Sequence, residues 1–141
     1  PDLRQCRVLL IGAGDIGRVV AKTFTNRQVG ALMIANRSMA NAVELAAEVG
    51  GAAIPLEHLY DHIGDVDVIV SGTGSPDYVL RHAEMREIRK DRPQQRLLLV
   101  DIAVPRDIDP QIATLPNVVL KNLYDLKEIV DRRAFPEKFR V

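Results

Sequence analysis

A run of glycines near the start of the chain has the spacing of a phosphate-binding turn. The first glycine of such a turn allows a sharp bend, the second lets the backbone approach a pyrophosphate, and the third lets a helix lie close to a strand. The amide groups and positive dipole end of that helix attract phosphate. The run reads Gly12-Ala13-Gly14-Asp15-Ile16-Gly17. We predict that these residues bind the pyrophosphate of a dinucleotide; the alternative is a strand-to-helix turn that binds nothing.

The residues after the second predicted strand indicate which dinucleotide would bind. An NAD site has an Asp or Glu there, about 20 residues beyond the glycines, which accepts a hydrogen bond from the ribose 2′-hydroxyl. This chain has Asn36-Arg37-Ser38 instead. Arg37 can pair with a 2′-phosphate and stack on adenine, and Asn36 and Ser38 can donate to its oxygens. The segment predicts NADP(H); the alternatives are a helix cap at Ser38 and a solvated surface arginine at position 37.

A second glycine-containing loop follows the fourth predicted strand. It reads Ser71-Gly72-Thr73-Gly74-Ser75-Pro76. Ligands of doubly wound sheets bind outside the carboxyl ends of the strands, where the strand order reverses. We therefore expect the first four residues of this loop to face the cofactor. The alternative is an ordinary helix start, with Ser75 as the N-cap and Pro76 in the first helical position.

Residues 101–110 follow the fifth predicted strand at the same edge of the sheet. Loops at this place reach the nicotinamide and the substrate in such folds. The alternative is a rigid connection whose path is fixed by its two prolines, with Arg106 paired to Asp107 or Asp109. Composition does not decide between these interpretations.

Neither the histidines nor the cysteine predicts a reactive site. His58 and His62 are four residues apart, but they do not form H-E-x-x-H and no third ligand is evident, so we predict a solvated polar face and no metal. Cys6 precedes the first strand, at the opposite end from the glycine turn. A plain packed thiol is the expected role there.

A local basic cluster is interrupted by acidic residues. It consists of Arg86, Arg89, Lys90 and Arg92. A charged helix surface explains this cluster, although a larger enzyme could use it to approach a nucleic-acid phosphate. The tyrosines are scattered and offer no stacking platform for single-stranded RNA.

Short apolar runs and helical stripes alternate along the chain. Runs rich in Val, Ile and Leu predict buried strands at 7–11, 31–35, 52–54, 67–71, 96–101 and 117–120. Helical stripes are formed by Ile16, Val19, Val20 and Phe24, by Ala42, Leu45, Ala46 and Val49, and by Leu126, Ile129 and Val130. We also expect a short helix at 55–63 and a polar-faced helix at 81–90.

This alternation predicts the fold that positions the loops described above. Strand, helix and strand in repetition indicate a doubly wound α/β domain of the Rossmann type, with about six parallel strands and helices on both faces. One domain, residues 1–141, accounts for the whole sequence.

Composition excludes several classes of protein. The chain has 141 residues, 47% of them hydrophobic, and a formal net charge of zero, so no broad basic field favours autonomous binding of nucleic acid. No apolar run approaches the roughly 20 residues of a membrane span. A single cysteine and no signal peptide suggest a reducing, cytoplasmic compartment. The start at Pro1 suggests a fragment of a longer polypeptide.

Several of these motifs resemble the NADPH-binding domain of glutamyl-tRNA reductase. The resemblance covers nearly the whole chain. It rests on the glycine turn at 12–17, on Ala35-Asn36-Arg37-Ser38, on residues 71–76, and most specifically on residues 101–110 followed by Tyr124-Asp125-Leu126. The first two motifs also occur in shikimate dehydrogenases, so the fifth-strand segment is the part that separates the two families.

The resemblance implies an activity for the full-length enzyme. In that family NADPH reduces the glutamyl group of glutamyl-tRNA to glutamate-1-semialdehyde for tetrapyrrole synthesis, through a thioester on a cysteine of a separate amino-terminal domain. No position here matches that cysteine motif, so no catalytic residue is assigned and the fragment alone should be inactive. A homodimer, transfer of the product to an aminomutase, and a cytoplasmic (in plants plastid) location are also implied.

Two other functions are compatible with the same residues. One is the NADP-binding domain of a shikimate or quinate dehydrogenase, with its substrate domain elsewhere in the parent chain. The other is a non-catalytic NADP-binding sensor module. The parent reading frame upstream of Pro1 distinguishes them, because only the enzymes require a further domain.

Overall fold

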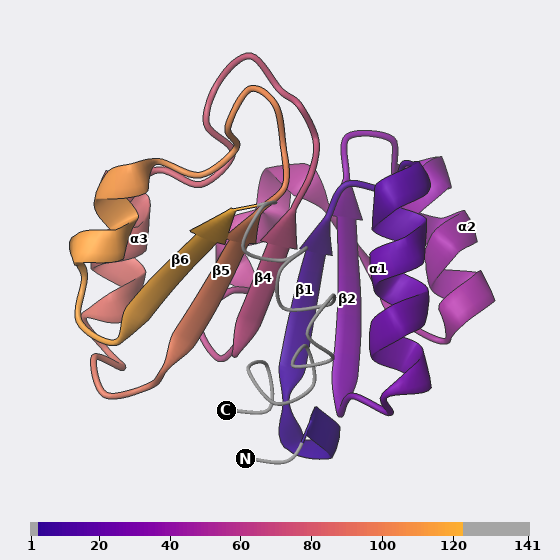
Figure 1. Cartoon of the computed structure of the whole chain (residues 1–141), viewed down its shortest axis with the longest axis horizontal. Coiled ribbons are helices and arrows are strands. Elements are labelled where there is room, and N and C mark those ends of the chain that lie inside the picture. The colour runs from indigo at the N-terminus through magenta and orange to yellow at the C-terminus, as the bar shows by residue number, and fades with distance from the viewer. Residues whose placement is uncertain (1–2, 123–141) are drawn as a thin grey trace.

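The core of the molecule is a parallel sheet of six strands, described here from a computed structural model that covers residues 3–122. The strand order is β3-β2-β1-β4-β5-β6, and every neighbouring pair is parallel (Figure 1). The predicted doubly wound fold is therefore confirmed. The strands are β1 (Arg7–Ile11), β2 (Ala31–Asn36), β3 (Ala52–Pro55), β4 (Val68–Ser71), β5 (Leu97–Asp101) and β6 (Val118–Asn122).

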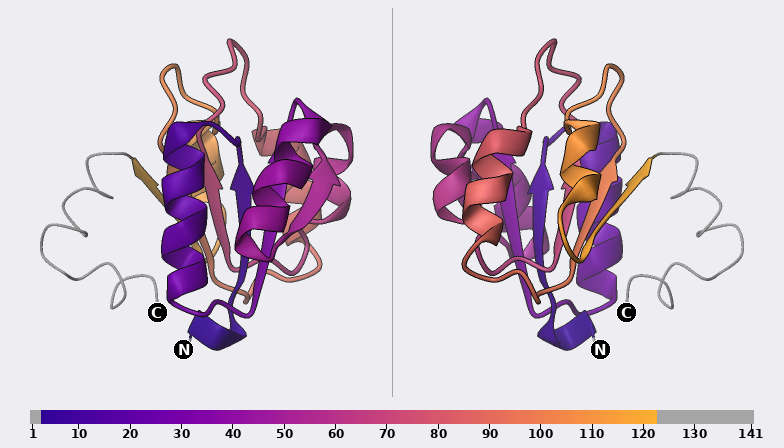
Figure 2. Two further views of the ribbon diagram at one scale, coloured as in Figure 1. Left: turned by 90° about the vertical axis from the view of Figure 1, so that its right-hand side faces the viewer. Right: turned by 90° about the vertical axis from the view of Figure 1, so that its left-hand side faces the viewer.

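Helices cover both faces of this sheet. The α-helices are α1 (Asp15–Asn26), α2 (Met39–Val49) and α3 (His82–Arg89), and the 3-10 helices are η1 (Leu3–Gln5), η2 (Leu56–Asp61) and η3 (Pro110–Thr114). Helices α1 and α2 pack on one face, whereas η2, α3 and η3 pack on the other (Figures 1 and 2). The short helix expected at 55–63 is thus the 3-10 helix η2, and the helix expected from the stripe Leu126, Ile129 and Val130 lies outside the described residues.

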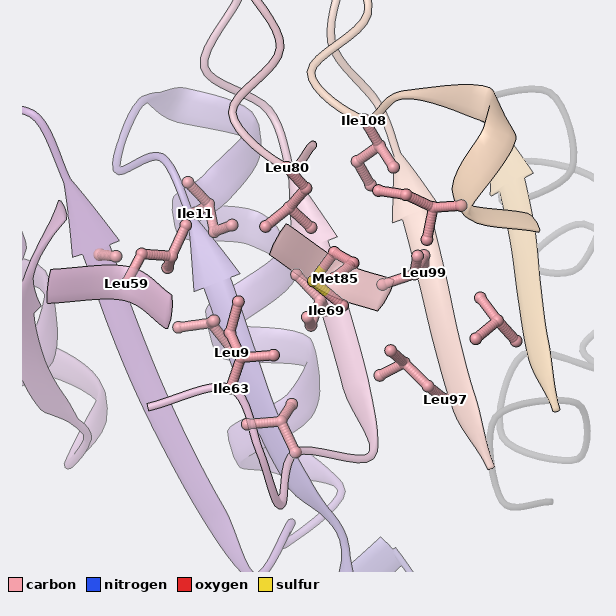
Figure 3. Close-up of a cluster of buried hydrophobic side chains, with 14 of the residues drawn as sticks. Leu9, Ile11, Leu59, Ile63, Ile69, Leu80, Met85, Leu97, Leu99 and Ile108 are labelled. Atoms are coloured by element: carbon pink, nitrogen blue, oxygen red, sulfur yellow. The ribbon is translucent and has the colours of Figure 1, made fainter. Parts of the chain in front are cut away.

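Alternation along the strands divides the interior into two apolar cores. In β1, Val8 and Leu10 face α1 and α2, whereas Leu9 and Ile11 face the opposite core. Four of the five β1 residues are buried because a sheet covered on both faces leaves no side for water. The second core also holds Met85 of α3 and Leu59 of η2 (Figure 3).

The predicted stripe of α1 is half confirmed: Phe24 is buried and Val20 packs against the core, whereas the other two residues are rotated out toward solvent. Ile16 and Val19 are 55% and 64% exposed, and the side that packs on the sheet is formed by Gly17, Ala21 and Phe24. The cause is the glycine turn. A Cβ at position 17 would lie 2.6 Å from the Gly12 carbonyl oxygen, so Gly17 must face the strand, and residues four and seven positions later share its face. The stripe predicted for α2 is confirmed, since all four of its residues are buried.

The helix start suggested at Ser75 and Pro76 is not observed. Helix α3 begins only after Arg81, and the segment before it crosses to the loop that follows β5. There Leu80 forms a parallel bridge with Ile108, and its amide donates to the Asp107 carbonyl oxygen. These contacts require extended backbone, which delays the helix. Among residues 3–122, no helix has the length and apolar character needed to cross a membrane.

Candidate functional site

A crevice of about 680 Å³ opens at the carboxyl ends of β1, β2 and β4. Eight of the residues predicted from the sequence line it, namely Gly12, Ala13, Gly14, Asn36, Arg37, Gly72, Thr73 and Gly74. Asp15, Ile16, Gly17, Ser38 and Ser71 do not line it. The loops that follow β4 and β5 rise above the arrowheads of the sheet beside this place (Figure 1).

Main chain and the methyl group of Ala13 form the floor of the crevice at the glycine turn. Gly12 has φ +111°, a conformation that glycine adopts without strain, and a Cβ there would lie 2.9 Å from the Gly72 carbonyl oxygen. Gly14 is the N-cap of α1, and a Cβ at this position would meet nothing within 4 Å. The open space lies at the amino end of α1, where backbone amides and the helix dipole favour an anion. The turn therefore has the shape that a pyrophosphate requires.

The end of β2 presents polar and basic groups to the crevice and no carboxylate. Asn36 and Arg37 both line it, and the Arg37 side chain forms no ion pair within residues 3–122. Asn36 Nδ2 donates to the Ser38 carbonyl oxygen at 3.3 Å, which braces this turn. Ser38 itself caps α2, since its Oγ accepts from the Asn41 amide at 3.2 Å. A free guanidinium beside the glycine turn suits a 2′-phosphate.

The loop after β4 is held in place by the buried carboxylate of Asp107, which lies on the loop after β5. Ser71 is fully buried and its Oγ donates to Asp107 Oδ2 at 2.7 Å, so its side chain is turned away from the crevice. Thr73 donates to the same carboxylate with both its amide and its hydroxyl, at 2.7 and 2.6 Å. The loop residues that line the crevice are Gly72, Thr73, Gly74, Ser75 and Pro76.

The suggestion that Arg106 pairs with Asp107 or Asp109 is wrong. Asp107 is buried and accepts from β4-loop donors, and Asp109 caps η3 through the Gln111 amide. Asp101, also buried, accepts from the amides of Ala103, Asp107 and Ile108 at 3.1, 3.0 and 2.8 Å. The bracing of this loop comes from the hydrogen bonds of two buried carboxylates, and the ion pair that the alternative named is not formed.

The sequence reading missed the wall of the crevice that comes from η2 and residues 77–81. This wall consists of Leu56, Glu57, Leu59, Tyr60, Asp77, Tyr78, Val79 and Arg81. Tyr60 fastens its two parts together, because its hydroxyl donates to the Val79 carbonyl oxygen and accepts from the Arg81 amide. Burial raises the pKa of Tyr60 above its usual value, so the phenol keeps its proton. The sequence signal that could have found this wall is that both segments belong to connections leaving the carboxyl ends of predicted strands, where ligands of such sheets bind.

The cysteine, the histidine pair and the basic cluster singled out in the sequence do not line the crevice. Cys6 is buried just before β1. His58 approaches Asp61 at 3.5 Å, and no group of metal-ligating side chains occurs within residues 3–122. The sequence predicted that Arg89 belongs to a charged helix surface, but its side chain is only 6% exposed. Its Nη2 donates to the carbonyl oxygens of Gln95 and Pro116, and burial lowers its pKa.

The strand order and the glycine turn define the class of protein, an NAD(P)-binding domain of the Rossmann type. The chain belongs to the shikimate / quinate 5-dehydrogenase family, whose model matches residues 1–129. Within this family it is similar to glutamyl-tRNA reductases: that of Maridesulfovibrio salexigens is 41% identical over 92% of the chain, and that of Methanosarcina acetivorans 46% over 89%. The chain spans 30% and 27% of the lengths of these relatives.

Solved structures give the same relationship. The glutamyl-tRNA reductase of Methanopyrus kandleri aligns with a TM-score of 0.84 and 35% identity, over 99% of this chain and 36% of that chain. The shikimate 5-dehydrogenase of Thermus thermophilus aligns with a TM-score of 0.63 and 21% identity, over 95% of this chain and 48% of that chain, and shares the fold. The resemblance to glutamyl-tRNA reductase that the motifs predicted is confirmed.

Proposed function

We propose that this chain is the part of a glutamyl-tRNA reductase that holds NADPH while glutamyl-tRNA is reduced to glutamate-1-semialdehyde. The observation that carries the proposal is the identity of 41–46% with reductases of that name over about nine tenths of the chain. Identity with the shikimate 5-dehydrogenase structure is only 21%, which supports the fold without the substrate. The proposal therefore favours glutamyl-tRNA reductase over a shikimate or quinate dehydrogenase.

The choice of NADPH over NADH rests on the end of β2. Arg37 lines the crevice without an ion-pair partner among residues 3–122, and Asn36 beside it offers an amide donor. A carboxylate at this place would bind the ribose hydroxyl of NAD and repel a 2′-phosphate. Its absence together with the free guanidinium supports NADP(H). When bound, this cofactor supplies the hydride for the reduction.

The proposal gives each region of the crevice a task. The open space at Gly14 and the amino end of α1 would accommodate the diphosphate. The β4 loop lies on the other side of β1 from Arg37, so an extended dinucleotide would run from β2 across the turn toward β4 and β5. Five residues predicted to contact the cofactor do not line the crevice, namely Asp15, Ile16, Gly17, Ser38 and Ser71. In this proposal they support the site indirectly, by forming helix α1, capping α2 and packing the turn.

The remaining activity belongs to the rest of the parent enzyme. No residue of this chain is assigned as the nucleophile, and we expect the isolated chain to bind cofactor without catalysing the reduction. We infer from the same resemblance that the parent enzyme is a homodimer in the cytoplasm, or in plants the plastid, and that an aminomutase consumes its aldehyde product.

A domain exchange tests the activity. This chain would replace the matching segment of the Methanosarcina acetivorans reductase, and NADPH-dependent formation of aldehyde from glutamyl-tRNA would be measured. The matched control carries the corresponding segment of the Maridesulfovibrio salexigens enzyme, which is related to this chain at a similar level. We expect both chimeras to be active. A chimera with this chain that binds NADPH but leaves glutamyl-tRNA unreduced, beside an active control, overturns the proposal.

A further inference from the structure

A buried carboxylate ties together the two loops beside the crevice. Asp107 is fully buried and does not line the crevice. Its Oδ2 accepts from the Ser71 hydroxyl and the Thr73 amide, both at 2.7 Å, and its Oδ1 accepts from the Thr73 hydroxyl at 2.6 Å. The two Thr73 donors lie on the loop after β4 and Ser71 is the last residue of that strand, whereas Asp107 lies on the loop after β5. The carboxylate thus links the start of the first loop to the second, in addition to the backbone contacts between residues 79–80 and 107–109.

Asp107 is itself fixed through its main chain. Its amide donates to Asp101 Oδ2 at 3.0 Å, and its carbonyl oxygen accepts from the amides of Val79 and Leu80 at 2.6 and 3.1 Å. Val79 lines the crevice, so Asp107 holds the end of the β4 loop through its main chain as well as the beginning through its side chain. The loop is attached to one residue at both places.

The donors that reach Asp107 have no freedom to turn elsewhere. The Thr73 hydroxyl, which donates to Asp107, also accepts from the Ser75 amide at 3.0 Å. Both hydrogen-bonding directions of this side chain are therefore occupied, and its orientation is set. Every side-chain partner of Asp107 in residues 3–122 is an uncharged donor, and a carboxylate accepting such bonds in a buried place binds more strongly than an amide would.

The position of the β4 loop matters because it touches the glycine turn. A Cβ on Gly12 would lie 2.9 Å from the Gly72 carbonyl oxygen, so the two backbones are in contact across the crevice floor. A shift of the loop by a fraction of an ångström changes the width of the crevice on the side away from Arg37. The half of the dinucleotide beyond the diphosphate would lie there.

We propose that Asp107 is a positioning residue for the cofactor: it holds residues 72–74 in the place where the nicotinamide half of NADPH is bound. This inference rests on the proposed function. It predicts that loss of the Asp107 carboxylate weakens binding of the nicotinamide half but not of the adenosine half. The reason is that Asp107 is remote from Arg37 and the end of β2, where the adenosine 2′-phosphate would bind. A general loss of folding would instead weaken the binding of both halves.

The test compares two ligands on one variant. Dissociation constants of NADPH and of adenosine 2′,5′-bisphosphate, which lacks the nicotinamide half, are measured by calorimetry for the wild-type chain and D107N. We expect D107N to weaken NADPH about tenfold, the equivalent of one or two hydrogen bonds, and to change bisphosphate binding less than about twofold. The control D109N removes the same charge two residues away, where the carboxylate caps η3, and should leave both constants unchanged.

The outcomes separate this inference from the proposed function. If the wild-type chain binds neither ligand, the proposed function fails and this inference fails with it. If the wild type binds both and D107N binds NADPH equally well, or loses both ligands to the same extent, only the positioning role is overturned. Should D107N not fold, T73V removes the hydroxyl contact from the loop side and T73S retains it; T73V with wild-type NADPH affinity overturns the role, and rescue by T73S supports it.

Discussion

The two sides of the crevice are built by different means. On the β2 side, residues adjacent in sequence hold each other, as when Asn36 donates to the Ser38 carbonyl oxygen two positions away. On the β4 side, the loop is held by Asp107, which is 36 residues from Ser71 and 34 from Thr73. The first side is therefore readable from a short motif, whereas the second depends on the topology that brings β4 and β5 together.

The largest expected effect concerns Arg37, on the locally built side. R37D replaces a free cation with a carboxylate and should cost NADPH binding about 3 kcal/mol, roughly a hundredfold, because a charge-assisted contact is lost and a repulsion is added. NADH affinity should stay constant or rise. Parallel titrations with NADPH and NADH measure this preference, and equal affinities for both cofactors in the unaltered chain would count against the role of Arg37.

A pair of glycine substitutions separates folding from binding. G17A places a methyl group 2.6 Å from the Gly12 carbonyl oxygen and should lower the free energy of unfolding by about 1–3 kcal/mol. G14A meets nothing within 4 Å and should leave stability nearly constant while weakening NADPH. Urea denaturation gives the first quantity and calorimetry the second. The assignment of the two glycines is wrong if G14A is the variant that loses stability.

A smaller effect is expected at Ser38. Since its Oγ accepts from the Asn41 amide and the residue does not line the crevice, S38A should lower the free energy of unfolding by about 1 kcal/mol. The dissociation constant of NADPH should change less than about threefold, which corresponds to less binding free energy than one hydrogen bond contributes. A large loss of affinity without loss of stability would return Ser38 to the direct phosphate contact that the sequence suggested.

The smallest effect concerns the wall at Tyr60. Burial raises its pKa, so the phenol should ionise above the value near 10 of a free tyrosine. The stability that depends on the protonated phenol is present below pH 10 and is lost as the pH rises beyond it, because the unfolded chain releases the proton first. Ultraviolet titration of the double variant Y78F/Y124F, in which Tyr60 is the remaining tyrosine, measures this midpoint. A midpoint at or below 10 contradicts the burial.

Sequence reasoning succeeded where one local pattern determines the structure. Continuous apolar runs gave the six strands, and the glycine spacing gave the turn at their edge. It failed where a distant contact decides. The exposed face of α1 follows from the packing of Gly17 against Gly12, and α3 starts late because residues 79 and 80 pair with the β5 loop. No period in the sequence contains either constraint.

The same division applies to the site. Arg37 and the glycines were found because their chemistry follows from residue type and local spacing. For Asp107 the sequence offered only an ion pair of Arg106 with Asp107 or Asp109, as one of two open alternatives, since nothing in the segment 101–110 shows that Ser71 and Thr73 lie against it. Arg89 was placed on a charged surface, although it donates to two carbonyl oxygens that only the fold brings within reach.

The contact of Gly12 with both Gly17 and Gly72 has a consequence for the energetics of binding. Three backbone segments touch there with no space for a methyl group, so the floor of the crevice has no rotamers to select. A ligand seated on such a surface does not have to freeze side-chain torsions, which elsewhere cost about 0.5–1.5 kcal/mol for each immobilised residue. Affinity at the floor is then set by the alignment of fixed amide dipoles. On heating, the two ends of the bound cofactor should become mobile at a lower temperature than its central diphosphate.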